Sequence, residues 1–167
     1  AREVEALTRL EDPRIASIFE AGVADGRAYL AMRLVKGPSL RQQLNQWQQG
    51  AGPGLRQRLQ LGLEIVRAVA AAHAQGVLHR DIKPGNVLLE AAVDGSQQPV
   101  LIDFGLARAV DTGASAAFGD TLTGDQMGTP SYMSPERLLG EGHDDPRADV
   151  WALGVLLYEL VTYRAPF

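Results

Sequence analysis

Cysteine is absent from this 167-residue sequence, and aromatic residues make up only 6% of it. Without cysteine, the chain has no disulfide, no thiolate metal ligand and no cysteine nucleophile. Positive charge is not in excess either, because the formal net charge is −4. We therefore expect no nucleic-acid partner, since nucleic-acid binding usually needs a concentrated basic face.

Long apolar runs are missing as well. The longest, residues 150–161, contains Glu159 and is too short to span a bilayer. We therefore expect no membrane segment in this chain. The lack of cysteine suits a reducing cytosol, so a cytoplasmic location is expected, although the parent protein could carry a membrane anchor outside this segment. The composition, 46% hydrophobic and 22% charged residues, is ordinary for a globular protein.

The hydrophobic pattern predicts a β-hairpin in the first third of the chain. A helix is expected to end near residue 10, before Pro13. Two apolar runs, 15–21 and 28–35, then flank the turn-forming residues 24–26. Further short β-like runs occur at 77–78, 87–89 and 100–102.

Helices are expected in the middle and at the end of the chain. Ser39 can cap a short helix that ends near Gln48. A longer helix to about residue 75 is predicted by apolar residues that recur at helical spacing: Leu55, Leu59, Leu63, Val66 and Ala70. The run 147–162 is apolar nearly all round, which predicts a buried helix with Trp151 in the core.

Three motifs carry chemistry. The strongest is HRDIKPGN at 79–86, whose five fixed residue types would arise by chance in about one in ten thousand chains of this length or fewer. The second is DFG at 103–105, which follows an apolar run; a carboxylate at a strand end is well placed for a hard cation. The third is GTPSYMSPE at 128–136.

These motifs resemble those of eukaryotic-type (Hanks-type) serine/threonine protein kinases, and the style of the catalytic loop is that of bacterial members. The resemblance covers the whole chain and implies an α+β, protein-kinase-like fold that is truncated at both ends of the domain. Residues 1–35 would be a remnant of the small lobe, with the end of helix C, the last two strands and the hinge. Residues 36–167 would form most of the helical large lobe.

The resemblance also assigns roles in phosphoryl transfer from ATP to a protein Ser/Thr hydroxyl. Asp81 would orient the acceptor hydroxyl and take its proton, and Lys83 would stabilise charge on the transferred phosphate and contact the nucleotide. Asn86 and Asp103 would bind Mg²⁺, or Mn²⁺ in its place. Lys83 is typical of serine/threonine rather than tyrosine kinases.

The adenine site is expected at the second strand of the hairpin. Met32 would be the gatekeeper, the backbone of Arg33 to Val35 would meet the adenine edge, and Leu88 would form the floor. The family usually has an acidic residue in place of Arg33, but the change should matter little because the backbone reads adenine there. Glu3 falls where the family's helix glutamate pairs with the ATP-binding lysine. That lysine and the glycine-rich loop are absent, so we expect the fragment itself to be inactive.

Two polar residues are expected to be structural. Asp149, in the run DVWALG, resembles the aspartate that braces the backbone of the catalytic loop. His79 is expected to be a packed core histidine rather than a catalyst.

Two other functions stay open. A pseudokinase or binding fragment would act without catalysis, but Asp81, Asn86 and Asp103 together argue against it. A small-molecule phosphotransferase of the aminoglycoside-kinase type has a similar loop, but Lys83 and the segment 128–136 favour a protein substrate. A kinase–kinase dimer is compatible with the sequence.

Regulation by phosphorylation generates a first prediction. Arg80 resembles part of the basic pocket that receives an activation-loop phosphate, and Thr129 resembles the threonine that hydrogen-bonds the catalytic Asp and Lys. Thr121 and Thr123 lie eight and six residues before Thr129, where bacterial members autophosphorylate. We expect phosphate on these two threonines in the active intact kinase. Phosphopeptide mapping that found both unmodified in active enzyme would contradict this.

Overall fold

The structure, a computed structural model, describes residues 6–25, 27–50, 52–92, 95–104, 130–141 and 145–167. The strands are β1 (Ile18–Ala24), β2 (Arg27–Met32), β3 (Val87–Ala91) and β4 (Gln97–Leu101), and the helices are α2 (Leu40–Gln48), α3 (Leu55–Ala74), α4 (Pro135–Leu138) and α5 (Pro146–Thr162). Short 3₁₀ turns, η1 and η2, lie at Pro84–Asn86 and Pro130–Tyr132. Helices and two small antiparallel sheets together make the α+β class that the sequence predicts. Among the described helices, none combines the length and apolarity needed to cross a bilayer.

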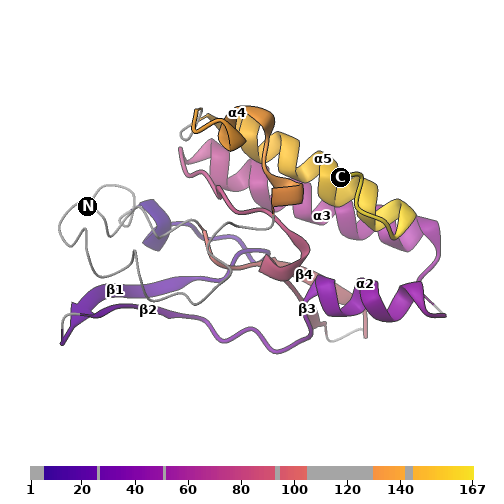
Figure 1. Ribbon diagram of the computed structural model, residues 1–167. Coiled ribbons are helices and arrows are strands. Elements are labelled where there is room, and N and C mark those ends of the chain that lie inside the picture. Colours follow the sequence, from indigo (N-terminus) through magenta and orange to yellow (C-terminus); the bar gives the residue numbers. More distant parts are fainter. Residues whose placement is uncertain (1–5, 26, 51, 93–94, 105–129, 142–144) are drawn as a thin grey trace.

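The hairpin lies on one side of the molecule and the long helices on the other (Figure 1). β1 pairs with β2 from Ile18–Met32 to Ala24–Arg27, with one irregularity near Glu20, so the predicted hairpin is confirmed. Helices α3 and α5 lie side by side, with the β3–β4 hairpin beneath them (Figure 1). The run 77–78, predicted to be β-like, is not a strand: it is a short connection after α3 that buries Val77.

The predicted start of α2 is confirmed. The Ser39 hydroxyl accepts from the backbone N–H of Gln42 at 3.3 Å, and the Gln42 side chain accepts from the Ser39 N–H at 2.8 Å. This reciprocal capping satisfies two N–H groups that the first turn of a helix leaves unpaired.

Helix α3 is confirmed, but most of the apolar stripe that predicts it is not buried. Leu55, Leu59 and Leu63 are exposed, whereas a parallel stripe is buried and consists of Leu61, Gly62, Ile65, Ala68, Val69 and Ala72. Two apolar stripes share one helix, and the stripe with small residues is the one that faces α5. At Gly62 an added Cβ would lie only 2.6 Å from the Leu157 side chain, so the absence of a side chain permits this close approach.

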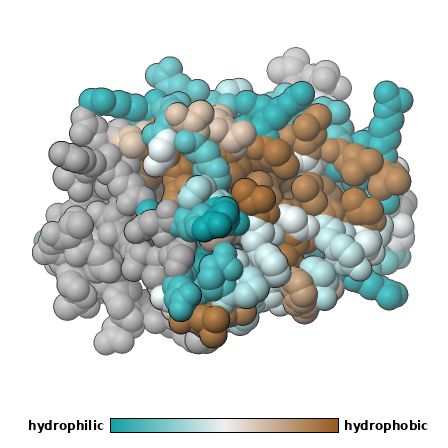
Figure 2. All heavy atoms as spheres, turned by 90° about the horizontal axis from the view of Figure 1, so that it is seen from above, coloured by the Kyte–Doolittle hydropathy of each residue, from teal (hydrophilic) through white to brown (hydrophobic). Residues whose placement is uncertain are grey.

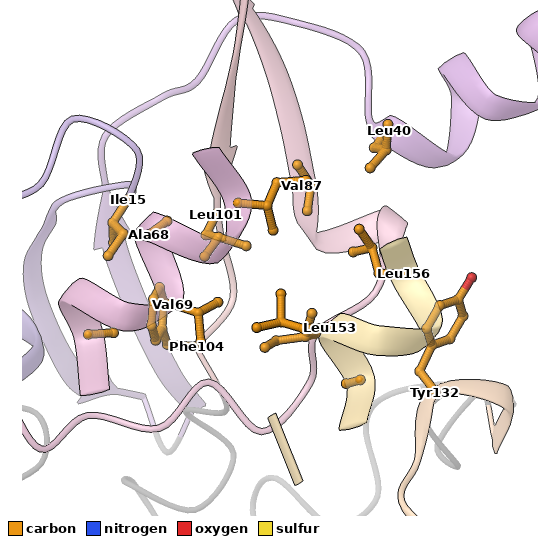
Figure 3. Packing of buried hydrophobic residues seen from close by; sticks show 14 of the residues in the cluster. Ile15, Leu40, Ala68, Val69, Val87, Leu101, Phe104, Tyr132, Leu153 and Leu156 are labelled. Atoms are coloured by element: carbon orange, nitrogen blue, oxygen red, sulfur yellow. The ribbon is translucent and has the colours of Figure 1, made fainter. Parts of the chain in front are cut away.

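The core lies where α3, α5 and the β3–β4 hairpin meet. Figure 3 shows Val69, Val87, Leu101, Leu153 and Leu156 converging from these elements. Each is less than a tenth exposed. The core therefore joins segments that are up to about half the chain apart. It also fixes the start of β3 at Val87 and the end of β4 at Leu101.

Trp151 is not in this core, contrary to the prediction from the all-round apolar run. Its side chain is partly exposed and stacks on Phe167 at 5.8 Å between ring centroids. Val150 and Tyr158 on the same helix are also exposed. Apolar side chains gather on the outer face of the helices (Figure 2).

The two stripes of α3 can be compared by matched substitutions. Ile65→Ala should lower the free energy of unfolding by about 2–5 kcal/mol, because Ile65 is fully buried and its loss leaves a cavity. Leu59→Ala removes an exposed side chain from the other stripe and should change it by about 0.5 kcal/mol or less. Urea denaturation measures both; equal losses would show that the faces are assigned wrongly.

Candidate active site

Asp149, in the first turn of α5, holds the loop 79–86 through hydrogen bonds from the backbone of that loop. Its carboxylate is 2% exposed and accepts from the N–H groups of His79 and Arg80, each at 2.8 Å. This confirms the predicted bracing role. His73 Nε2 also lies 2.8 Å from the carboxylate, a contact that sequence reasoning missed. A histidine in the last turn of a helix has no pattern that distinguishes it from a surface residue.

The braced loop contains an unfavourable backbone conformation. Arg80 has φ = 65°, in the left-handed region that costs a residue with a side chain about 1–2 kcal/mol. Its N–H is held by Asp149, and its carbonyl oxygen accepts from the guanidinium of Arg137. Contacts on both sides of the residue therefore maintain the turn that leads into Asp81.

His79 is a core residue, as predicted. Its ring is fully buried and lies 4.5 Å from the ring of Phe104. Burial lowers the pKa of the imidazole, so the ring is neutral at pH 7. Its Nδ1 accepts from the N–H of Asp81 at 3.3 Å, and the core thereby helps to orient the catalytic-loop aspartate.

Asp81, Lys83 and Asn86 converge as the sequence predicts. The turn η1 brings Asn86 back toward Asp81, and its Nδ2 donates to both the carbonyl oxygen and Oδ2 of Asp81, each at 2.8 Å. Lys83 Nζ lies 2.8 Å from the same Oδ2. The other carboxylate oxygen of Asp81 makes no hydrogen bond within the described ranges. One oxygen is thus fixed, while the other can accept a proton or a hydrogen bond.

Asp103 is brought to this loop by the pairing of β3 with β4. Val87 pairs with Leu101, and the N–H of Ile102 donates to the carbonyl oxygen of Asn86 at 3.0 Å. Asp103 follows immediately, is exposed, and has φ = 56°, a conformation that Asp tolerates better than most residues. Its carboxylate has no hydrogen bond or ion pair within the part of the chain that the structure describes.

The oxygen donors fit a cation that is bound together with a phosphate ligand. Both amide hydrogens of Asn86 donate to Asp81, so its Oδ1 remains as a neutral oxygen that could bind a cation. Asp103, which follows the residue paired with the Asn86 backbone, offers a carboxylate. The described residues hold no group of three or more His, Cys, Asp or Glu side chains that could bind a metal alone. Mg²⁺ commonly takes one or two protein oxygens and completes its shell with substrate phosphates and water.

The residues expected around adenine share a small apolar cluster. Met32, Val35 and Leu88 pack with Val100 and Ile102, next to the strand that leads to Asp103. The structure therefore brings the expected gatekeeper, hinge and floor residues together. Their contact with adenine stays a prediction.

A second polar cluster, which sequence reasoning missed, fixes the segment after residue 129. The Tyr132 hydroxyl donates to the carboxylate of Glu159 on α5, and Arg41 of α2 binds the same carboxylate at 2.5 Å. Tyr132 and Glu159 are both buried, and burial, followed by the neighbouring carboxylate, raises the pKa of the tyrosine. The partners are up to 118 residues apart, so no local pattern reveals them.

Four predicted regulatory residues, Glu3, Thr121, Thr123 and Thr129, lie outside the described residues. Arg80 is described, and its backbone contacts are given above. Its part in receiving a phosphate stays a prediction.

Comparison with known proteins identifies the family. The protein kinase domain family matches residues 1–167, the whole chain. The chain therefore belongs to the protein kinase domain family.

Its relatives include bacterial serine/threonine kinases. The chain is 38% identical over 167 residues to the serine/threonine-protein kinase PknJ of Mycobacterium tuberculosis, and 41% identical over 167 residues to PkaA of Streptomyces coelicolor. It is 38% identical over 170 residues to pkn3 of Myxococcus xanthus. Each match covers 99% of this chain but only 26%, 29% and 30% of the respective relative.

The brace can be tested by stability. Asp149→Ala leaves two buried N–H groups without an acceptor and should lower the free energy of unfolding by about 2–4 kcal/mol. Asp145→Ala, at the N-cap of the same helix, removes the cap to the Arg147 N–H and an exposed ion pair with the Arg147 side chain, and should cost about 1 kcal/mol. Chemical denaturation compares them. If Asp149→Ala cost no more than Asp145→Ala, the brace would not be the stabilising contact described here.

Proposed function

We propose that this chain carries the catalytic segment of a serine/threonine protein kinase, which transfers the γ-phosphate of ATP to Ser or Thr hydroxyls of proteins. The observation that carries the proposal is the arrangement of Asp81, whose Oδ2 is held by Lys83 and Asn86 while its second oxygen is available. That arrangement suits proton transfer from an acceptor hydroxyl.

The residues divide the chemistry between them. Asp81 orients the acceptor hydroxyl at its second oxygen and takes the hydroxyl proton. The hydroxyl oxygen forms a bond to the γ-phosphorus while the bond from that phosphorus to the bridging oxygen of ADP breaks, so ADP is the leaving group. The ammonium group of Lys83 lies at the Asp81 carboxylate, where its positive charge offsets negative charge on the transferred phosphoryl group. Asn86 and Asp103 are the side chains that hold Mg²⁺. When bound, Mg²⁺ neutralises phosphate charge, which is the main requirement of this reaction.

A protein substrate is favoured over a small molecule by the segment 130–138. Tyr132 anchors this segment between α2 and α5 through Arg41 and Glu159. The resemblance places an acceptor peptide against this segment, and the rigid anchoring gives such a peptide a defined surface. The relatives PknJ and PkaA are likewise named serine/threonine-protein kinases.

A binding-only function is the second candidate, and one substitution separates it from catalysis. In the complete gene product, Asp81→Asn should lower phosphorylation of a generic protein substrate with Mg²⁺·ATP by about 10²- to 10⁴-fold, because a general base typically supplies that factor. ATP affinity should change little. Transfer of ³²P from labelled ATP measures activity.

A matched control supports the interpretation. Glu141→Gln makes the same carboxylate-to-amide change at an exposed position away from the loop and should leave activity unchanged. An Asp81→Asn variant as active as its parent would exclude the role given to Asp81. A parent without phosphotransfer would favour the binding-only function.

A further inference from the structure

The segment expected to meet adenine lies along β3. The N–H of Leu89 donates to the carbonyl oxygen of Pro38 at 2.9 Å, and Ser39 forms an antiparallel bridge with Leu88. At Gly37 the two backbones approach so closely that an added Cβ would lie 2.0 Å from the carbonyl oxygen of Leu89. One end of the segment 33–39 is therefore fixed to β3 by its backbone.

The other end is held by a backbone hydrogen bond, from the N–H of Arg33 to the carbonyl oxygen of Ser17 at 2.8 Å, and by a pair of side chains. Arg33 Nη1 donates to both oxygens of Glu90, at 3.0 and 2.8 Å, across 57 residues of sequence. Hydrogen bonds from Arg33, and to a smaller extent the backbone N–H of Lys36, hold the pKa of the Glu90 carboxyl below its usual range. Glu90 therefore binds the side chain of Arg33, the first of the residues whose backbone is expected to meet adenine.

Between these attachments, Val35 is buried, whereas Leu34 and Lys36 are exposed. Val35 is 7% exposed and packs in the cluster with Met32 and Leu88, whereas Leu34 is 78% exposed. The position of the backbone relative to Leu88 therefore depends on how firmly both ends are attached. At the end nearer to Met32, the Arg33–Glu90 pair attaches the segment to β3.

We propose that Arg33 and Glu90 are positioning residues that hold the backbone of 33–35 at a fixed spacing from Leu88 and thereby raise affinity for the adenine nucleotide. The inference rests on the proposed function, since it concerns the nucleotide site of that reaction. It gives the Arg33 side chain a use of its own, in addition to the backbone contact expected at this position.

The test is a double-substitution cycle in the complete gene product. Arg33→Ala and Glu90→Ala should each weaken binding of Mg²⁺·ADP about three- to fivefold, the range expected for a well-aligned, partly exposed ion pair. The double variant should bind no more weakly than either single variant, because both remove the same interaction. Exchanging the charges, Arg33→Glu with Glu90→Arg, should restore affinity to within about twofold. Calorimetry measures binding.

Kinetics and hydrogen exchange distinguish positioning from a general loss of stability. The KM for ATP should rise with the binding loss, while kcat changes by less than about twofold. The amide of Leu89 should exchange faster in the single variants. Arg67→Ala, which breaks an exposed ion pair with Glu64 on α3, is the matched control and should alter none of these values.

Several results would overturn the proposal. It fails if the single variants bind Mg²⁺·ADP like the parent, or if the double variant shows the product of the two single losses. A parent that binds nucleotide but transfers no phosphate refutes the proposed function while leaving the cycle interpretable. A parent that binds no nucleotide refutes both, and the exchange of Leu89 then still reports whether the ion pair attaches the segment.

Discussion

The buried carboxylate of Asp149 on α5 fixes the loop that contains His79 and Arg80. These two residues lie 70 and 69 positions earlier in the chain. The other site contacts follow in order from this one. Asp149 sets the backbone of His79 and Arg80, and the loop then presents Asp81. Asn86 returns to Asp81 and immediately precedes β3. Because β4 pairs with β3, Asp103 arrives beside Asn86. Displacing Asp149 would therefore disturb the positions of Asp81, Asn86 and Asp103 together.

The cost of burying this charge explains the number of its partners. An ionised carboxylate that is 2% exposed is tolerated only when its oxygens are hydrogen-bonded, and Asp149 has two backbone N–H groups and His73 within 2.8 Å. The same contacts offset the left-handed conformation of Arg80. The hydrogen bonds of Asp149 thus offset the cost of burying its charge and also maintain the strained turn at Arg80. The turn and the buried charge therefore depend on each other.

Local patterns predicted the elements, and motifs predicted the catalytic loop, but neither predicted the contacts between distant segments. The hairpin and the Ser39 cap depend on neighbouring residues and are confirmed. The helix α3 was predicted but its buried face was not, because helical spacing identifies an apolar stripe but does not say which stripe meets a partner. Trp151 was misplaced for the same reason. His73–Asp149 and Arg41–Glu159 join residues 76 and 118 positions apart, where side-chain type alone carries no information about distance.

The polar contacts that hold the parts of the site differ in how deeply they are buried, and therefore in how strongly they resist disruption. The Asp149 contacts and the Tyr132–Glu159 pair lie in the interior, where low dielectric strengthens them and salt barely reaches them. Arg33 and Glu90 remain about one third exposed, so water and ions weaken their attraction. The loop at Asp81 and the segment after residue 129 are therefore held by buried bonds. Under the proposed function, the segment expected to meet adenine is held by a weaker, partly exposed pair, which can yield at modest cost when the nucleotide enters and leaves.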